Sequence, residues 1–151
     1  MTEFLVEHWT GPPTQEDLNS INKMNREELK QTTELTWDQF ISFLNKPHII
    51  FIVARKKDTK EMIGKQTMYL NPLDCGIMKT YLDQVTTDSR YTRMGVAKAI
   101  WNKLIEVTRE KGGAFEAHWT SGNKKEAAQQ FYDAIPGCTR RDTNNFVFKM
   151  S

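Results

Sequence analysis

Cysteine and long apolar runs are both scarce in this sequence of 151 residues. The only cysteines are Cys75 and Cys138, and the first 30 residues carry charges where a signal peptide needs an uninterrupted apolar run. We therefore expect a reducing, cytoplasmic location. The longest apolar run, Ile49–Ala54, is far too short to cross a bilayer, so no membrane association is expected.

Metal-ligand spacing and an excess of one charge sign are also missing. His8 and His48 do not stand at the spacing of metal ligands, and two isolated thiols cannot form a zinc site alone, so no metal is expected. The 21 basic and 19 acidic residues are interspersed and leave a net charge of +2. Without a polybasic stripe to neutralise phosphates, we expect no nucleic-acid partner.

The apolar and aromatic content is high enough for a folded core, at 38% and 11% of the residues. The length suits one domain, 1–151, and no repeat or low-complexity linker divides it. Strands are predicted at 4–9, 48–55, 62–70, 79–87, 114–119 and 144–150, and helices at 95–109, 124–134 and beginning near Thr14 and Thr36. This order predicts an α+β or mixed α/β layered fold.

The stretch SRYTRMGVAKAIW, residues 89–101, leads into the helix with the clearest apolar periodicity. A glycine-containing turn before a helix points several backbone N–H groups outward, where the helix dipole favours an anion. Arg90, Arg93 and Lys98 add positive charge, and the small Gly95 and Ala97 permit close approach of a phosphate. The alternative is a structural turn that lets a strand run into a well-packed helix; neither of the common phosphate-loop patterns is present.

The sequence resembles the GCN5-related N-acetyltransferase (GNAT) superfamily from about residue 49 to residue 150. The acetyl-CoA turn of that family has Gln or Arg, two variable residues, Gly, one variable residue, and Gly or Ala; TRMGVA matches the last two fixed positions but begins with Thr92. GNKKEAAQQFYDAIPG, residues 122–137, is similar to the late helix of the family. The resemblance implies a mixed, mostly antiparallel sheet of six to seven strands flanked by about four helices.

The resemblance also implies where acetyl-CoA binds. The pantetheine arm would follow the fourth strand at Val85, Thr86 and Thr87. The diphosphate would lie on the turn formed by Thr92, Arg93, Met94, Gly95, Val96, Ala97 and Lys98. Asn123 is a further candidate cofactor contact, but the family asparagine stands seven residues before the tyrosine, where this chain has Lys125. With Glu126, Asn123 also fits a helix cap.

Two residues are predicted to act in catalysis. Tyr132 matches the family tyrosine that protonates the departing thiolate, a role that suits a phenol because it is a neutral donor at pH 7; the alternative is a core tyrosine. Asp83 matches an acidic residue on the fourth strand that often deprotonates the amine, or it is a solvated surface carboxylate. His118 is a second candidate base by its chemistry.

The function expected from these residues is direct transfer of an acetyl group from acetyl-CoA to a primary amine of a small molecule. The alternatives are a protein or peptide amine as acceptor, and a catalytically silent CoA-binding or regulatory module. The acceptor pocket would use residues 25–37 and 138–145, which offer Glu27, Glu28 and Glu34 for a cation and Arg140 and Arg141 for an anion. Both sets also fit plain surface. An exposed edge strand at the C-terminus is consistent with a homodimer.

Overall fold

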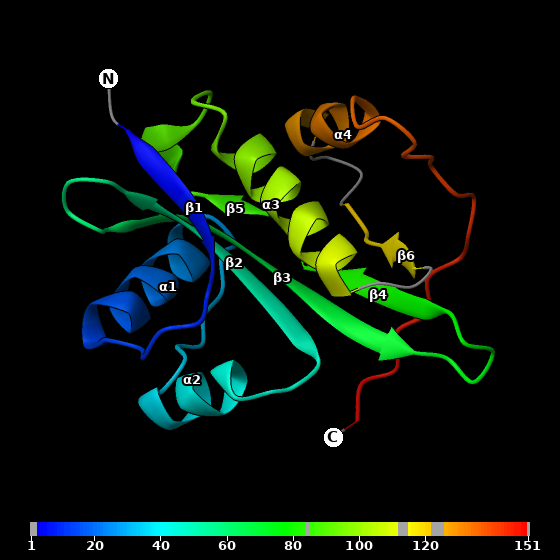
Figure 1. Cartoon of the computed structure of the whole chain (residues 1–151), viewed down its shortest axis with the longest axis horizontal. Coiled ribbons are helices and arrows are strands. Elements are labelled where there is room, and N and C mark those ends of the chain that lie inside the picture. The colour runs from blue at the N-terminus through cyan, green and yellow to red at the C-terminus, as the bar shows by residue number, and fades with distance from the viewer. Residues whose placement is uncertain (1–2, 84, 112–114, 122–125, 151) are drawn as a thin grey trace. The chain divides into compact units, whose positions relative to one another are not determined.

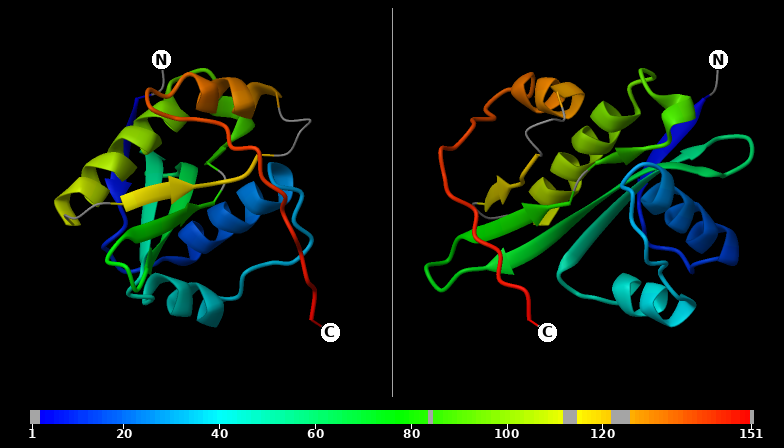
Figure 2. Two further views of the ribbon diagram at one scale, coloured as in Figure 1. Left: turned by 90° about the vertical axis from the view of Figure 1, so that its right-hand side faces the viewer. Right: turned by 180° about the vertical axis from the view of Figure 1, so that it is seen from behind.

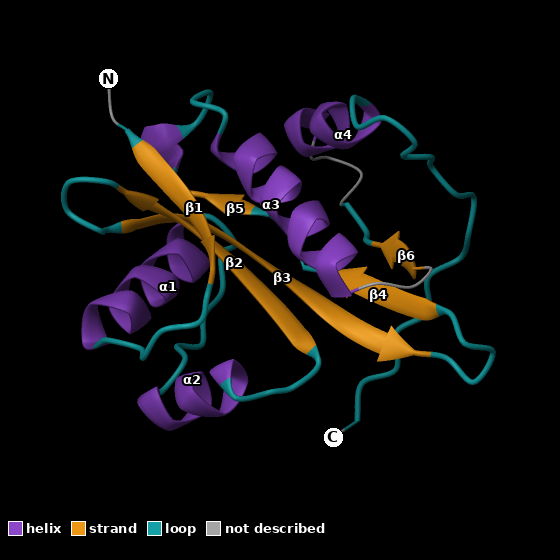
Figure 3. Cartoon of the chain, viewed as in Figure 1, coloured by secondary structure: helices purple, strands orange, loops and turns teal. Residues whose placement is uncertain are grey.

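The computed structural model describes residues 3–83, 85–111, 115–121 and 126–150 and consists of two compact units, Met1–Trp119 and Thr120–Ser151. Figure 1 traces the chain through both, and Figure 3 separates helices from strands. The elements are β1 (Phe4–His8), α1 (Gln15–Glu27), α2 (Trp37–Leu44), β2 (Ile49–Lys56), β3 (Met62–Pro72), β4 (Met78–Leu82), β5 (Thr86–Thr87), the 3₁₀ turn η1 (Ser89–Tyr91), α3 (Val96–Lys111), β6 (Phe115–His118) and α4 (Glu126–Asp133).

The first unit is built on one six-stranded sheet. Its strand order is β1-β2-β3-β4-β6, and β5 pairs with β3 outside that path. Every pairing is antiparallel except that of β4 with β6, which is parallel. The mixed, mostly antiparallel sheet confirms the predicted fold class.

The two N-terminal helices begin where the sequence predicted. Thr14 and Asp17 form a complete capping box, since the Thr14 hydroxyl accepts a hydrogen bond from the Asp17 N–H and the Asp17 carboxylate accepts one from the Thr14 N–H. Thr36 and Gln39 do the same at α2. These bonds satisfy N–H groups that the first turn leaves without intrahelical partners.

Two hydrophobic layers cover the two faces of the sheet. On one face, α3 packs through Val96, Ile100 and Leu104 against β2 and β3. On the other face, α1 and α2 pack around Phe40, which is completely buried, and Phe51 of β2. The view from behind in Figure 2 shows α1 and α2 opposite α3. The side chains of β2 alternate between the two layers, as a strand buried on both faces requires.

The described part of the second unit contains one helix, α4, followed by irregular chain. Residues 138–150 form neither helix nor strand, so the predicted strand at 144–150 is wrong (Figure 3). The apolar pattern there is suited to a strand, but the described part of this unit contains no strand to pair with it. Phe146 and Phe148 are accordingly 89% and 88% exposed. The C-terminal edge strand that suggested a homodimer is therefore not formed.

None of the helices in the described residues is both long enough and apolar enough to cross a membrane.

Candidate active site

The predicted phosphate turn lies at the start of α3 and contains two residues in the left-handed backbone conformation. The 3₁₀ turn η1 ends at Tyr91, the hydroxyl of Thr92 donates to the Ser89 carbonyl at 3.2 Å, and α3 begins at Val96. Between them, Arg93 and Gly95 have positive φ angles of 64° and 80°. Left-handed residues in a tight turn can direct nearby N–H groups toward one side, as in backbone anion sites.

The chemistry of this loop fits a diphosphate. The first intrahelical bond of α3 runs from the Ala99 N–H to the Gly95 carbonyl, at 3.0 Å, so the preceding N–H groups have no intrahelical acceptor. The first turn of α3 carries no acidic residue, and Arg93 and Lys98 are exposed. A Cβ placed on Gly95 would meet no atom within 4 Å, so the space before its backbone is open.

A second glycine brings α3 close to the sheet. A Cβ on Gly64 of β3 would lie 2.9 Å from both the Ile100 Cδ1 and the Val96 Cγ1 atoms and 3.3 Å from the Thr86 carbonyl oxygen. Real side chains do not make such contacts, so the first turn of α3 packs where it does because residue 64 has no side chain.

Arg90 stabilises the loop from within. Its Nε donates to Asp88 Oδ1 at 3.0 Å, and its Nη2 lies 2.6 Å from Asp88 Oδ2 and 2.8 Å from Glu61 Oε1. Hydrogen bonding to Arg90 lowers the pKa of Asp88, and the bonds to Asp88 and Glu61 raise the pKa of Arg90. The positive charge predicted for a phosphate at Arg90 is therefore already paired with two carboxylates.

The segment expected to be one strand at 79–87 is divided in two. The parallel pairing of β4 with β6 ends at Tyr81 and His118, and the described residues that follow pair with β3, through β5. Thr86 and Thr87 form β5, and Val85 precedes it. At the break, the Asp83 N–H donates to the Thr67 carbonyl at 2.9 Å. The buried Gln66 Nε2 donates to the Asp83 carbonyl at 3.1 Å. The side chain of Gln66 thus replaces a backbone partner at this irregular position.

Asp83 is exposed at this break and has two neighbours on β3 that the sequence analysis missed. The Tyr69 hydroxyl lies 3.4 Å from Asp83 Oδ2, and burial, together with the Asp83 charge and hydrogen bond, raises the pKa of Tyr69 to about 12. Burial lowers the pKa of Lys65, while the Asp83 charge acts in the opposite direction. The alternation of Lys65, Thr67 and Tyr69 along β3 was the available signal, since it places all three on one face.

His118 and Tyr132, the other predicted catalytic residues, have different surroundings. His118 Nε2 lies 3.1 Å from Glu116 Oε2 on the same strand, an arrangement that serves as a surface ion pair when the imidazole is protonated. In the second unit, Tyr132 lies on α4, is 7% exposed, and packs its ring 5.5 Å from that of Phe131. Asn123, the remaining predicted cofactor contact, falls outside the described residues.

The charges predicted to recognise the acceptor are largely engaged within the protein. Glu28 accepts a hydrogen bond from the Ser89 N–H at 3.0 Å, and Glu34 pairs with Arg26 at 2.9 Å. In the second unit, Arg140 Nε donates to Asp133 at 2.9 Å. The bond that Glu28 accepts joins the C-terminal end of α1 to the start of the predicted phosphate turn, so this carboxylate orders the loop.

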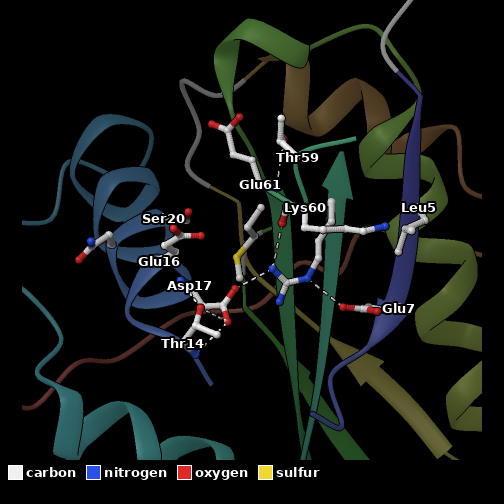
Figure 4. A pocket seen from close by; sticks show the side chains of 12 residues that line it. Leu5, Glu7, Thr14, Glu16, Asp17, Ser20, Thr59, Lys60 and Glu61 are labelled. Carbon is white, nitrogen blue, oxygen red and sulfur yellow. Dashed lines mark hydrogen bonds and ion pairs between the residues drawn. The ribbon is translucent and has the colours of Figure 1, made fainter. Parts of the chain in front are cut away.

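A pocket beside β1, α1 and the β2–β3 turn is lined in part by Glu61, the ion-pair partner of Arg90, but by none of the predicted catalytic or cofactor-binding residues. Figure 4 shows Glu7 and Asp17 reaching toward its centre from β1 and α1, and Arg55 bridges them with contacts of 2.8 and 2.6 Å. Arg55 also lies 4.8 Å from the centre of the Trp9 ring. Because its central cation is paired on both sides, we interpret this pocket as a structural ion-pair network. No cluster that could hold a metal occurs among the residues described.

The sequence profile of the Acetyltransferase (GNAT) family matches residues 12–135. The chain therefore belongs to the GNAT family, and it is an N-acetyltransferase. Members of this family generally use acetyl-CoA. No curated protein sequence is significantly similar to the chain.

Solved structures of acetyltransferases share the fold over nearly the whole chain. An acetyltransferase of Trypanosoma brucei is 18% identical, with a TM-score of 0.76 and coverage of 98% of this chain and 100% of that one. An aminoglycoside acetyltransferase from an uncultured soil metagenomic sample, in complex with trehalose or sisomicin, is 14% identical, with a TM-score of 0.83 and coverage of 98% and 97%. A ribosomal-protein-alanine N-acetyltransferase of Brucella melitensis is 14% identical, with a TM-score of 0.70 and coverage of 97% and 99%.

Proposed function

We propose that the protein transfers an acetyl group from acetyl-CoA directly to a primary amine of a small molecule. The observation that carries the proposal is the connection from β4 to α3. It combines an exposed carboxylate, Asp83, with an open left-handed turn at Arg93 and Gly95. We further propose that both units form one acetyltransferase domain, since the family match extends from the first into the second.

Acetyl-CoA would supply an activated thioester. The backbone N–H groups from Arg93 to Lys98 would bind its diphosphate, and the segment Val85–Thr87 would accompany the pantetheine arm, as the family resemblance implies. Lys98 and Arg93 add long-range attraction for this anion, while the fixed N–H groups determine its position.

Asp83 would act on the acceptor. An alkylamine has a pKa of about 10, so at neutral pH it arrives as an ammonium ion that cannot attack a thioester. Asp83 would attract that cation and accept its proton, directly or through water. Tyr132 would then donate the phenol proton to the departing thiolate, an assignment that rests on the FY motif in the sequence.

A small-molecule acceptor is supported by the chemistry around Asp83. Tyr69 and Tyr81 lie in register on β3 and β4 and are 37% and 45% exposed. Exposed aromatic rings beside a carboxylate suit a compact amine with an apolar or ring-shaped body. Three of the structurally similar proteins are aminoglycoside acetyltransferases, which is consistent with such an acceptor.

The test is an acceptor screen in which release of the CoA thiol is measured with aminoglycosides, other small amines and peptides with a free α-amino group. We expect turnover with small amines and binding of acetyl-CoA by calorimetry. Turnover confined to peptides would change the acceptor class, and binding without turnover across the panel would indicate a silent CoA-binding module.

The Asp83→Asn variant tests the site itself. We expect thiol release to fall by about a hundredfold, the lower range for loss of a general base, with acetyl-CoA affinity retained. Glu116→Gln is the matched control, because it neutralises another exposed carboxylate of the same sheet, and it should retain activity. Equal losses in the two variants would show that only the net charge matters.

A further inference from the structure

Tyr69 and Asp83 are brought together by the way the sheet changes its pairing. Tyr69 lies on β3 opposite Tyr81 of β4, and Asp83 follows two residues after Tyr81, so all three share one face. The Tyr69 hydroxyl is 3.4 Å from Asp83 Oδ2, and both residues belong to the first unit. The contact spans 14 positions of sequence and therefore depends on the fold.

The geometry of the break fixes the Asp83 backbone as well as its side chain. The N–H of Asp83 is bound to the Thr67 carbonyl and its C=O to the Gln66 amide, at 2.9 and 3.1 Å. A carboxylate on a backbone held at both ends has little freedom except rotation of its own side chain. The Tyr69 hydroxyl is the group in place to limit that rotation.

The charges around this pair favour a phenol that stays protonated. Burial and the nearby Asp83 carboxylate raise the pKa of Tyr69 to about 12, so the hydroxyl is a donor throughout the physiological pH range. Lys65 of β3 is the charged neighbour of Asp83. His118 of β6 pairs with Tyr81 of β4, which stands two residues before Asp83.

We propose that Tyr69 is a positioning residue for Asp83: its hydroxyl donates to Oδ2 and leaves Oδ1 to receive the proton of the acceptor amine. This inference rests on the proposed function, in which Asp83 is the base. In the step, the ammonium N–H bond breaks, its electron pair stays on nitrogen as the nucleophile, and the proton forms an O–H bond at Oδ1. Tyr69 itself neither gains nor loses a proton.

The first test measures the contact without any activity. The pKa of Tyr69 is followed by the ¹³Cζ resonance of labelled tyrosine in the full-length protein, with and without Asp83→Asn. We expect the pKa to fall from about 12 toward the ordinary value of 10, since the substitution removes the negative charge and burial alone remains. An unchanged Tyr69 pKa would overturn the proposal.

The second test separates positioning from binding. Tyr69→Phe should lower kcat about threefold to tenfold, the range of one hydrogen bond, while the Kd of acetyl-CoA is unchanged. An unchanged kcat in Tyr69→Phe would overturn the role of Tyr69 alone. Full activity of Asp83→Asn would instead overturn the proposed base, and the role of Tyr69 with it.

Discussion

Replacement of Gly64 by alanine tests how closely α3 must pack for the loop before it, the proposed diphosphate site, to form. The new Cβ would stand 2.9 Å from Val96 Cγ1 and Ile100 Cδ1, whereas carbon atoms pack best at about 3.5–4.0 Å. Ile100 can move the end of its side chain. Val96 is β-branched and stiff, so its backbone must shift by about 0.5–1 Å with the first turn of α3.

The cost to stability is the difference between two effects. Overpacking of a closed core costs about 1–3 kcal/mol, and the reduced freedom of the unfolded chain returns about 0.4–1 kcal/mol. We expect a net loss of about 1–2 kcal/mol, which corresponds to a fall in Tm of about 3–6 °C for a chain of this size. Gly11→Ala is the matched control, because a Cβ there meets nothing within 4 Å, and its Tm should not fall.

The displacement should also weaken acetyl-CoA binding at the proposed site. A shift of the first turn lengthens the hydrogen bonds from its N–H groups, and we expect the Kd of acetyl-CoA, measured by isothermal titration calorimetry, to rise about tenfold, or about 1.4 kcal/mol. Adding Val96→Ala removes the clashing methyl group, so the loss in the double variant should be smaller than the sum of the single losses. Unchanged affinity and stability in Gly64→Ala would refute the argument.

Three further predictions concern the loop, Tyr132 and Asp88. Gly95→Val should reduce acetyl-CoA affinity far more than Arg90→Ala, because a branched residue resists a φ of 80° while Arg90 is paired with Asp88 and Glu61; equal losses in calorimetry would mean that surface charge dominates. Tyr132→Phe should lower kcat with the cofactor Kd nearly unchanged, and a large loss of affinity would reassign Tyr132 to binding. The pKa of Asp88 is lowered in the folded state, so its stabilising effect is present above about pH 4 and disappears as the pH falls through the folded pKa. Asp88→Asn should therefore destabilise the protein at pH 7 in denaturant titrations, and the difference from wild type should shrink below pH 4; a constant difference would contradict this.

Local patterns in the sequence were sufficient to predict several elements. The capping boxes at Thr14 and Thr36 are formed within four residues, and α3 follows from the apolar periodicity of its own segment. The hairpin of β2 and β3 follows from two apolar runs joined by a short polar turn. The family resemblance is confirmed, and it rested on motifs that are also short and contiguous.

Features that depend on distant partners were predicted less well. The segment 144–150 has a strand-like pattern, but a strand forms only where hydrogen-bonding partners are available, and the pattern does not contain that information. Arg90 was expected to add positive charge near the turn, but the sequence does not reveal that Glu61, 29 residues earlier, lies beside it. Asn123, Val85–Thr87 and the loop remain predictions for cofactor contact.

The division of 79–87 into two strands brings these observations together. If the pairing with β6 had continued, the segment between Leu82 and Thr86 would have been regular strand. Asp83 would then have had ordinary backbone partners on both neighbouring strands. Because the chain changes its pairing there, backbone groups of Asp83 are bound by Thr67 and by the Gln66 amide.

Gln66 is 3% exposed, and its Oε1 has no hydrogen-bond partner within the described part of the chain. A buried polar side chain with one group unsatisfied costs stability, and here it holds the backbone of the proposed base in place. Methionine has a similar volume, so Gln66→Met would remove both the unsatisfied Oε1 and the hydrogen bond to the Asp83 carbonyl. We therefore expect this variant to be at least as stable as the wild type but slower in thiol release.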